Sequence, residues 1–420
     1  MSTLDEPGEV ARNAAPDASP HSIDLSRPSR ELRLFIVAGE PSGDALGAKL
    51  MRAIAARRRG RVRYLGVGGP LMEVEGLISQ FPLSDVAVIG PLAILKRLPH
   101  LVRRVHQTVD AAIAAEPDVV VIIDSPEFTQ PIAKRISRRR PNLPIVNYVS
   151  PSVWAWRSWR ARRMARYIDH VMALLPFEPA AHIELGGPPC TYVGHPLIER
   201  LDELRGIDPA PLAQRLGIDR GAPVLVVLPG SRRSEVERLM EPFGKTVEQL
   251  AREIEGLSVI IPVVEHVREL VEARLADWPV KPALVAGEDD KFRAFKLARA
   301  ALAASGTVTL ELALAGTPMV VAYKVDAVAA RFGFLIKAPH WALANIILGE
   351  RAFPELMQAD CVPEALAPAV ASLFADGPVR AAQVSALARV PVIMKQGSQG
   401  SPSEMAADIV LAHAENPRRR

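Results

Sequence analysis

Short apolar runs alternate with longer amphipathic stretches along most of the chain. The first series predicts strands at 34–38, 119–123 and 145–149, with helices at 44–58 and around 130–139. The second series predicts strands at 224–228, 258–263, 283–285, 300–304 and 319–322, and helices at 235–255, 265–276, 291–299 and 308–315. Such alternation is typical of parallel sheets covered by helices on both faces. We therefore predict an α/β protein with two doubly wound, Rossmann-like domains.

The break between the two series defines the expected domains. Residues 199–222 are polar and punctuated by Gly and Pro, so we expect a linker there between an N-terminal domain (31–200) and a C-terminal domain (201–385). Facing sheets of this kind bind ligands in a central cleft, at the carboxyl ends of their strands. Residues 386–420 are expected to hold a helix at 402–413, for which a return to the N-terminal domain is one option, and a basic tail. Residues 1–30 are rich in Pro, Ser, Ala and acidic residues and are expected to be a disordered tail.

Composition narrows the class of protein. The 420 residues carry a formal charge of +4 and two cysteines whose spacing fits no metal site, so a cytosolic protein without a thiolate-bound metal is the default expectation. The apolar run at 300–323 approaches the length of a membrane span. Turn residues at Ser305–Gly306 and Gly316–Pro318, and Glu311 in its middle, favour a buried strand, helix and strand instead.

Candidate site residues of the first domain lie in the loops that follow two of the predicted strands. The loop after 34–38 contains Gly39, Glu40, Ser42, Gly43 and Asp44. Its glycines either bring the backbone close to a ligand or form only a tight turn, and their spacing disfavours a dinucleotide site. Asp124 ends the apolar run at 119–123, where partial desolvation would raise its pKa and suit a general base. The equally good alternative is a turn-opening aspartate before Ser–Pro.

Two further segments are rich in basic residues. Three of the five tryptophans and five arginines fall within residues 154–166. This composition suits a surface that binds the phosphates of single-stranded nucleic acid or lipid head groups. Alternatively, it is a solvated helix face. We expect no nucleic-acid partner, because no accompanying motif is present. Residues 86–104 are apolar with Lys96, Arg97, Arg103 and Arg104 beside them. They either dock on an anionic membrane or admit an acyl chain, or they form an ordinary core helix with a solvated basic end.

Candidate chemistry in the second domain points to a phosphate. Gly230, Ser231 and Arg232 follow the strand at 224–228, and a capping box formed by Ser234 and Glu237 predicts a helix start beside two arginines. A second turn and helix contain Ser305, Gly306, Thr307 and Glu311, in which Thr307 could meet a phosphate and Glu311 ribose hydroxyls. Three more polar groups, which caps and core hydrogen bonds explain equally well, are Asn345, Glu355 and Gln358.

Seven motifs together carry a family resemblance. They are GEPSGD (39–44), IDSP (123–126), PSVWAW (151–156), VGHPL (193–197), LPGSR (228–232), SGT with a later Glu (305–311) and PELMQ (354–358). In this order they resemble the lipid-A-disaccharide synthases over about 34–361. The resemblance implies a metal-independent, cofactor-free, inverting glycosyltransferase of the GT-B fold at the cytoplasmic face of the inner membrane. It would join UDP-2,3-diacylglucosamine to 2,3-diacylglucosamine 1-phosphate (lipid X), giving lipid A disaccharide 1-phosphate and UDP.

The same resemblance implies roles for individual residues. Asp124 would deprotonate the acceptor 6-hydroxyl, with Glu40 as the fallback base. Arg232 would hold the UDP phosphates, Ser305, Gly306 and Thr307 would line the phosphate turn, and Glu311 would meet the ribose. Asn345, Glu355 and Gln358 would lie near the donor site.

Departures from the family pattern are confined to Glu127, where an aspartate is usual, and to both tails. Another UDP-sugar GT-B enzyme, either an N-acetylglucosaminyltransferase to a lipid or a UDP-sugar epimerase, is the alternative. The sequence leaves a homodimer open.

Overall fold

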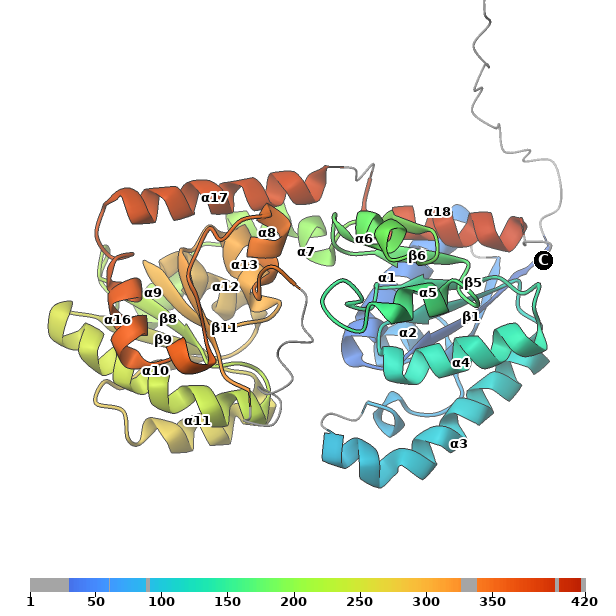
Figure 1. Cartoon of the computed structure of the whole chain (residues 1–420), viewed down its shortest axis with the longest axis horizontal. Coiled ribbons are helices and arrows are strands. Elements are labelled where there is room, and N and C mark those ends of the chain that lie inside the picture. The colour runs from blue at the N-terminus through green and yellow to red at the C-terminus, as the bar shows by residue number, and fades with distance from the viewer. Residues whose placement is uncertain (1–29, 60, 88–90, 326–337, 397–399, 417–420) are drawn as a thin grey trace, which may run out of the picture.

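The computed structural model describes residues 30–59, 61–87, 91–325, 338–396 and 400–416, and within α3 no side chain before residue 98. The chain forms two sheets, each covered by helices on both faces (Figure 1). The first has the order β3-β2-β1-β4-β5-β6-β7 and is parallel throughout. Its strands are β1 (Leu32–Ala38), β2 (Val62–Val67), β3 (Ile78–Ser79), β4 (Val119–Ile123), β5 (Ile145–Tyr148), β6 (His170–Ala173) and β7 (Cys190–Tyr192).

The second sheet has the order β10-β9-β8-β11-β12-β13 and is also parallel. Its strands are β8 (Val224–Leu228), β9 (Ser258–Pro262), β10 (Ala283–Val285), β11 (Ala300–Ala304), β12 (Met319–Tyr323) and β13 (Glu355–Met357). Every strand predicted from the sequence is present. The five that were not predicted, β2, β3, β6, β7 and β13, are short or carry exposed polar positions, which weakens their apolar signal.

Helices connect the strands. Those of the first half are α1 (Pro41–Arg57), α2 (Pro70–Val74), α3 (Pro91–Ala115), α4 (Pro126–Arg139), α5 (Trp159–Met164), α6 (Glu178–Glu184), α7 (Pro196–Glu199), α8 (Leu201–Gly206) and α9 (Ala210–Leu216). Those of the second half are α10 (Arg233–Glu253), α11 (Arg268–Leu275), α12 (Glu288–Leu297), α13 (Val308–Ala315), α15 (Leu343–Leu348), α16 (Pro363–Ala371), α17 (Pro378–Lys395) and α18 (Pro402–Glu415). Single 3-10 turns form η1 (Leu83–Asp85), η2 (Glu265–Val267) and η4 (Gln358–Asp360).

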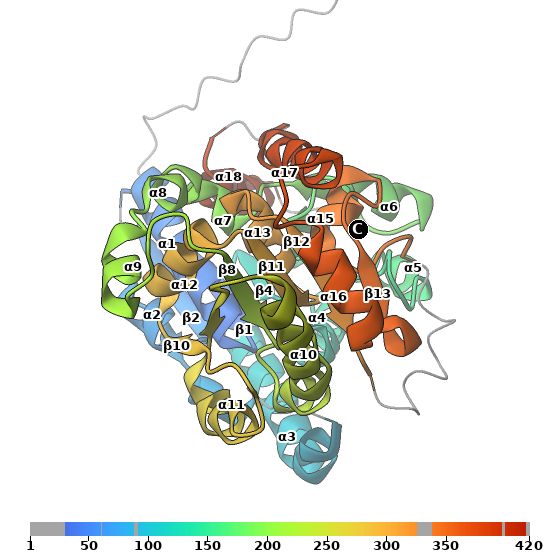
Figure 2. The ribbon, with the colours of Figure 1, turned by 90° about the vertical axis from the view of Figure 1, so that its left-hand side faces the viewer.

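Burial on both faces explains why the central strands are continuous apolar runs. In β1, Leu34 and Ile36 pack on the side of α1, whereas Phe35 and Val37 pack on the side of α3 and α4. All four side chains are fully buried. In the second sheet, α10, α11 and α16 cover one face (Figure 2), and α12, α13, α15 and α17 cover the other.

The C-terminal segment joins the two halves. Helix α17 packs against the second sheet, while α18 lies along α1 and buries Ala406, Ala407 and Val410 in the core of the first (Figure 1). Near the end of α17, the Met394 carbonyl accepts a hydrogen bond from the hydroxyl of Tyr192 on β7 at 2.5 Å.

The segment 199–222, expected to be a polar linker, contains two short helices. Leu201 and Leu204 of α8 and Leu212 of α9 are buried in the core of the second sheet. Regular leucine spacing on short helices is hidden by the surrounding Gly, Pro and charged residues, which is why the pattern was missed.

Both sheets reverse their strand order once. The reversal lies between β1 and β4 in the first sheet and between β8 and β11 in the second. At such a switch point the two following connections leave toward opposite faces and open a crevice at the carboxyl edge, where ligands of open α/β sheets bind. The turns after β1, β4, β8 and β11, which carry most of the predicted site residues, follow the strands at these two switch points.

Candidate active site

The turns after β1 and β4 touch each other closely at the first crevice. A Cβ atom on Gly39 would lie 2.5 Å from the Ser125 Cβ, so only glycine allows this approach. Gly43 packs against Ile123, and Gly47 packs against Met72. These glycines therefore serve close contact between chain segments, and the contact at Gly39 brings the turn that carries Glu40 against the turn that carries Asp124.

Within the glycine-containing loop, Asp44 has a structural task. Its carboxylate is buried and accepts hydrogen bonds from the amides of Gly69, Leu71 and Met72 at 2.8–3.0 Å, which caps the start of α2. Its oxygens are thus committed to the protein. Ser42 and Glu40 are exposed at the start of α1, where Glu40 is the N-cap residue.

Asp124 occupies a strained turn at the tip of β4. Asp124 and Ser125 both have left-handed backbone angles, with φ of 51° and 43°, and each such non-glycine residue costs on the order of 1 kcal/mol. One carboxylate oxygen of Asp124 accepts the Ser125 amide at 2.8 Å. The other oxygen has no partner among the described residues. The turn therefore presents a carboxylate oxygen at the crevice.

The electrostatics of Asp124 suit proton transfer. Burial of the carboxyl group raises its pKa, the amide of Ser125 opposes the shift, and the negative charge of Glu40 adds to it. A carboxylate with a raised pKa is a stronger base and remains ionised near neutral pH when the shift is moderate. The hydroxyl of Ser125 beside it is buried and has no hydrogen-bond partner within the described ranges.

The turn after β8 is built around a buried glutamate that sequence reasoning missed. Glu235 accepts hydrogen bonds from the amides of Ser231 and Arg232 and from the Tyr323 hydroxyl, at 2.9–3.1 Å. Gly230 has a φ of 107°, and a Cβ there would lie 2.6 Å from the Glu235 Cβ. The capping box predicted at Ser234 is wrong, because the N-cap of α10 is Arg232 and the glutamate that reaches back is Glu235.

Arg232 remains available for an anion. Its side chain is 65% exposed, although Nη1 lies 3.1 Å from the Glu235 carboxylate. The next two amides, of Arg233 and Ser234, have no hydrogen-bond partner in the part of the chain that the structure describes. Exposed guanidinium, open helix amides and the positive end of α10 together can bind a phosphate.

The turn after β11 is tied to a loop from further along the chain. Ser305 donates to the Trp341 carbonyl at 2.8 Å, and Thr307 is the N-cap residue of α13. Glu311 is paired with Lys291, whose Nζ lies 2.9 Å from the carboxylate. The assignment of Glu311 to a ribose stays a prediction, and any ribose bond would share this carboxylate with Lys291.

Asn345 and Glu355 lie beneath that loop rather than in the crevice. Glu355 is buried and accepts from the amides of Trp341 and Ala342 and from the Asn345 side chain, at 2.9–3.2 Å. Asn345 is fully buried and accepts the Ala352 amide at 3.0 Å. Both side chains therefore position the loop. Gln358 has a φ of 53°, and its side-chain oxygen accepts the Val325 amide at 3.3 Å.

A hydrogen bond between Trp154 and the buried Glu178 holds the motif at 151–156 in place. The Trp154 indole nitrogen donates to Glu178 at 3.3 Å, and the amides of Leu174 and Leu175 donate to the same carboxylate. Burial raises the pKa of Glu178 to about 7. In the neighbouring motif, His195 accepts the Leu197 amide at 3.2 Å, and burial lowers its pKa to about 4. These groups fix the loops at the carboxyl edge of the first sheet.

Two kinds of feature were sought in the part of the chain that the structure describes: membrane-spanning helices and metal sites. No helix among the described residues is long and apolar enough to cross a bilayer. Within the same residues, no group of three or more His, Cys, Asp or Glu side chains is arranged to hold a metal ion.

Comparison with known proteins identifies the family. Residues 34–409 match the family model described as lipid-A-disaccharide synthetase. The chain is 52% identical over 380 residues to the lipid-A-disaccharide synthase of Rhodopseudomonas palustris (strain HaA2), covering 90% of this chain and 95% of that protein. It is also 52% identical over 381 residues to the corresponding synthase of Nitrobacter hamburgensis (strain DSM 10229 / NCIMB 13809 / X14), with the same coverage.

The fold comparison agrees. The crystal structure of UDP-GlcNAc 2-epimerase from Neisseria meningitidis bound to UDP-GlcNAc superposes with a TM-score of 0.56 at 12% identity, covering 92% of this chain and 100% of that chain. At this identity the likeness concerns the fold alone, and the predicted two-domain Rossmann-like GT-B fold is confirmed. The family resemblance drawn from the seven motifs is confirmed as well. The chain belongs to the lipid-A-disaccharide synthase family.

Proposed function

We propose that this chain is an inverting glycosyltransferase that joins UDP-2,3-diacylglucosamine to 2,3-diacylglucosamine 1-phosphate and releases UDP. Family membership supports the activity. The observation that carries the mechanism is the pair of turns at the two switch points: the turn after β4 holds a carboxylate with a raised pKa, and the turn after β8 holds an arginine at an open helix start. An acceptor hydroxyl and a leaving diphosphate need these two groups on opposite sides of the reacting carbon.

In the proposed reaction, Asp124 takes the proton of the acceptor 6-hydroxyl. The hydroxyl oxygen attacks C1 of the donor sugar from the face opposite the diphosphate, and a new O6–C1 bond forms. The bond between C1 and the diphosphate oxygen breaks, and its electron pair leaves with UDP. The configuration at C1 is inverted, and the proton remains on Asp124 until solvent removes it. Glu40 raises the basicity of Asp124 through its charge and is the fallback base.

On the donor side, the diphosphate would lie at the start of α10. Arg232 and the amides of Arg233 and Ser234 would neutralise the charge that develops on the leaving group, where fixed donors stabilise a transition state most effectively. Ser305, Gly306 and Thr307 would line the adjoining turn, and Glu311 would meet the ribose. Asn345 and Glu355 would act by holding the Trp341 loop beside Ser305.

Attachment to the membrane is part of the proposal. Both substrates carry acyl chains, so the enzyme would associate peripherally with the cytoplasmic face of the inner membrane. Residues 98–104 of α3 expose Leu98 and Val102 beside Arg103, whereas Lys96 and Arg97 lie where side chains are not described. A homodimer remains a prediction.

Product analysis tests the activity. The purified protein is incubated with UDP-2,3-diacylglucosamine and lipid X, and the disaccharide 1-phosphate is sought by mass spectrometry, with UDP release measured in parallel. Formation of the disaccharide only when both substrates are present supports the proposal. Conversion of a UDP-sugar without acceptor would instead identify an epimerase, the alternative that relatives at 52% identity do not favour.

A further inference from the structure

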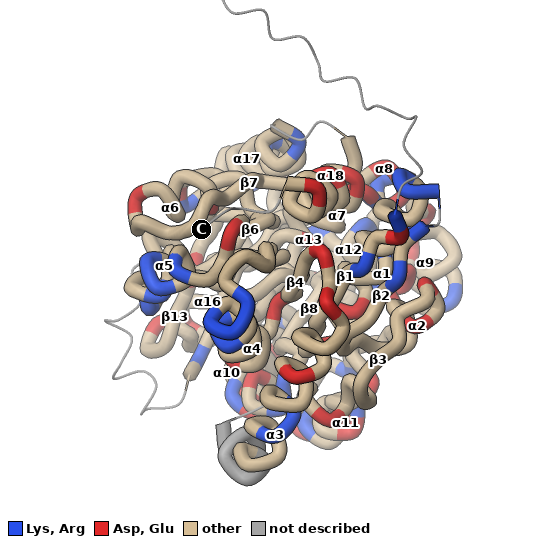
Figure 3. The backbone as a smooth tube through the Cα atoms, turned by 90° about the vertical axis from the view of Figure 1, so that its right-hand side faces the viewer, with Lys and Arg blue, Asp and Glu red and all other residues tan. Residues whose placement is uncertain are grey.

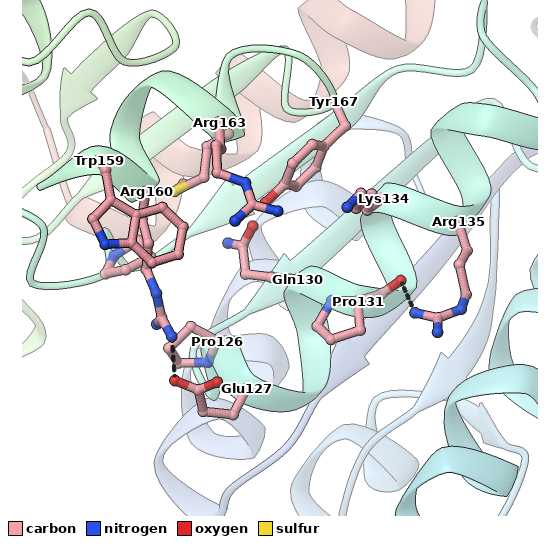
Figure 4. Close-up of a pocket in the computed structure, with 12 residues that line it drawn as sticks. Pro126, Glu127, Gln130, Pro131, Lys134, Arg135, Trp159, Arg160, Arg163 and Tyr167 are labelled. Atoms are coloured by element: carbon pink, nitrogen blue, oxygen red, sulfur yellow. Dashed lines mark hydrogen bonds and ion pairs between the residues drawn. The ribbon is translucent and has the colours of Figure 1, made fainter. Parts of the chain in front are cut away.

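A pocket of about 260 Å³ lies between α4 and α5, on one face of the first sheet (Figure 4). It begins at Pro126, two residues after Asp124, and runs along α4. Polar and aromatic side chains from both helices and from the turn after α5 line it, among them Gln130, Lys134, Arg160, Arg163 and Tyr167. The pocket therefore starts one residue beyond the turn, Asp124 and Ser125, that carries the proposed base.

Positive charge is concentrated around this pocket. Figure 3 shows Lys and Arg gathered along α5 and the adjoining part of α4. Glu127 is the one carboxylate among the lining residues, and it is already bonded to Arg160 at 2.7 Å. Lys134 and Arg163 form no ion pair within the described residues. Nearby Arg138, together with burial and other arginines, lowers the pKa of Lys134. Such a cluster of like charges attracts an anion.

Two polar atoms without a hydrogen-bond partner among the described residues, Ser125 Oγ and Gln130 Oε1, lie on the segment between Asp124 and Lys134. Gln130 donates through Nε2 to the Asn147 side chain at 2.8 Å, and Asn147 in turn donates to the Val149 carbonyl, which fixes both amides. The oxygen of Gln130 is consequently left buried without a partner among the described residues, as is the hydroxyl of Ser125. Buried polar atoms in native proteins are nearly always satisfied by protein, ordered water or a ligand, so these two atoms are free to hydrogen-bond with a bound sugar.

We propose that this pocket is the acceptor subsite and that Lys134, Arg160 and Arg163 bind the phosphate monoester of the acceptor glycolipid. The inference rests on the proposed function. Pro126 and Gln130 are separated by about 6 Å of helix, at 1.5 Å per residue, which is comparable with the width of one hexose ring. By the same measure Lys134 lies about 12 Å from Pro126, and its long side chain, which a helix directs back toward its N-terminus, meets the phosphate of a sugar whose 6-hydroxyl meets Asp124. Ser125 and Gln130 meet its hydroxyl or amide groups on the way.

The rim of the pocket suits a lipid substrate. Trp156 and Trp159 are 43% and 53% exposed, and the guanidinium groups of Arg157 and Arg163 lie 4.1 and 4.9 Å from their ring centroids. Exposed indole rings flanked by arginine are favoured at a boundary between apolar and aqueous surroundings. An acceptor entering from a bilayer presents its phosphate at that boundary.

The test compares two acceptors that differ only in the phosphate: 2,3-diacylglucosamine 1-phosphate and 2,3-diacylglucosamine, both in uncharged detergent micelles. The double variant Lys134→Gln/Arg163→Gln is measured beside the control Arg139→Gln, which removes an arginine of the same helix that is paired with Asp110. We expect the double variant to lose about ten- to hundredfold in kcat/KM with the phosphorylated acceptor, as for charge-assisted hydrogen bonds. It should lose little with the other acceptor, and UDP binding should not change.

Equal losses with both acceptors, or none, would overturn the inference. A second result would also overturn it: the double variant keeps the wild-type preference for the phosphorylated acceptor but binds anionic vesicles more weakly. The basic cluster would then recognise a bilayer surface. Direct binding of both glycolipids, measured without donor, keeps the inference separate from the proposed function. If the wild type forms no disaccharide yet binds the phosphorylated glycolipid through Lys134 and Arg163, the proposed function fails and the pocket assignment stands.

Discussion

Replacing Asp124 by asparagine tests the proposed base at the least structural cost. Asparagine has the same shape and keeps an oxygen that can accept the Ser125 amide. Because the pKa of Asp124 is raised in the folded protein, its ionised form is disfavoured by folding, and the neutral amide removes that penalty. We therefore expect the variant to melt at the same temperature as the wild type or slightly higher. Activity should nevertheless fall by about 100- to 10,000-fold, the usual contribution of a general base.

The assay measures disaccharide formation and UDP affinity on the same preparations across pH 4 to 9. In the wild type, activity should fall as the pH is lowered through the raised pKa of Asp124, because the base must be ionised. Glu40→Gln removes the negative charge that helps raise this pKa, so its acid limb should move to lower pH while activity near neutrality is retained. Wild-type turnover by Asp124→Asn, or loss of activity in Glu40→Gln instead, would assign the base to Glu40.

Three further predictions concern the donor side and the loops. Arg232→Gln should weaken UDP binding about ten- to hundredfold, as measured by calorimetry, because one charge-assisted phosphate contact is lost; unchanged affinity would remove Arg232 from the diphosphate site. Asn345→Ala should lower the free energy of unfolding by about 2 kcal/mol in urea titrations, since the buried Ala352 amide and Glu355 each lose a partner, and a neutral result would contradict the positioning role. Glu178, with a folded pKa of about 7 against 4.5 for the free group, contributes stability that is full below pH 4.5 and lost as the pH rises through 7. Glu178→Gln should make the melting temperature less dependent on pH over this range. An unchanged dependence on pH would show that other groups cause it.

Local sequence was sufficient to predict the long buried strands and the turns that follow them. Val119–Ile123 and Val224–Leu228 were predicted to the residue, because strands covered on both faces must be apolar without interruption. The start of α10 was misplaced by two residues. Both Ser234 with Glu237 and Arg232 with Glu235 are spaced as capping boxes, and only the packing of Gly230 against Glu235 selects the second.

Several polar residues could not be assigned from spacing at all. Asp44 lies in a loop that resembles a ligand-binding turn, yet both oxygens of its carboxylate accept hydrogen bonds from backbone amides 25 to 28 residues away. Asn345 and Glu355 likewise satisfy a buried loop through partners that the sequence does not mark. Nothing in the sequence distinguishes Glu235 from the other glutamates of α10, and its burial follows from the approach of Tyr323 on β12.

The sequence by itself determined the strand–helix alternation, the small residues at the turns and, through seven ordered motifs, the family. These properties are local, because each depends on the burial or backbone freedom of a few consecutive residues. Only the tertiary structure decided which turns meet. The order of strands in a parallel sheet is set by how long crossovers pack, so the adjacency of β1 with β4 and of β8 with β11 cannot be read from any segment alone. That adjacency brings Glu40 near Asp124, and the packing of α4 beside α5 gathers the basic pocket at the turn that follows β4.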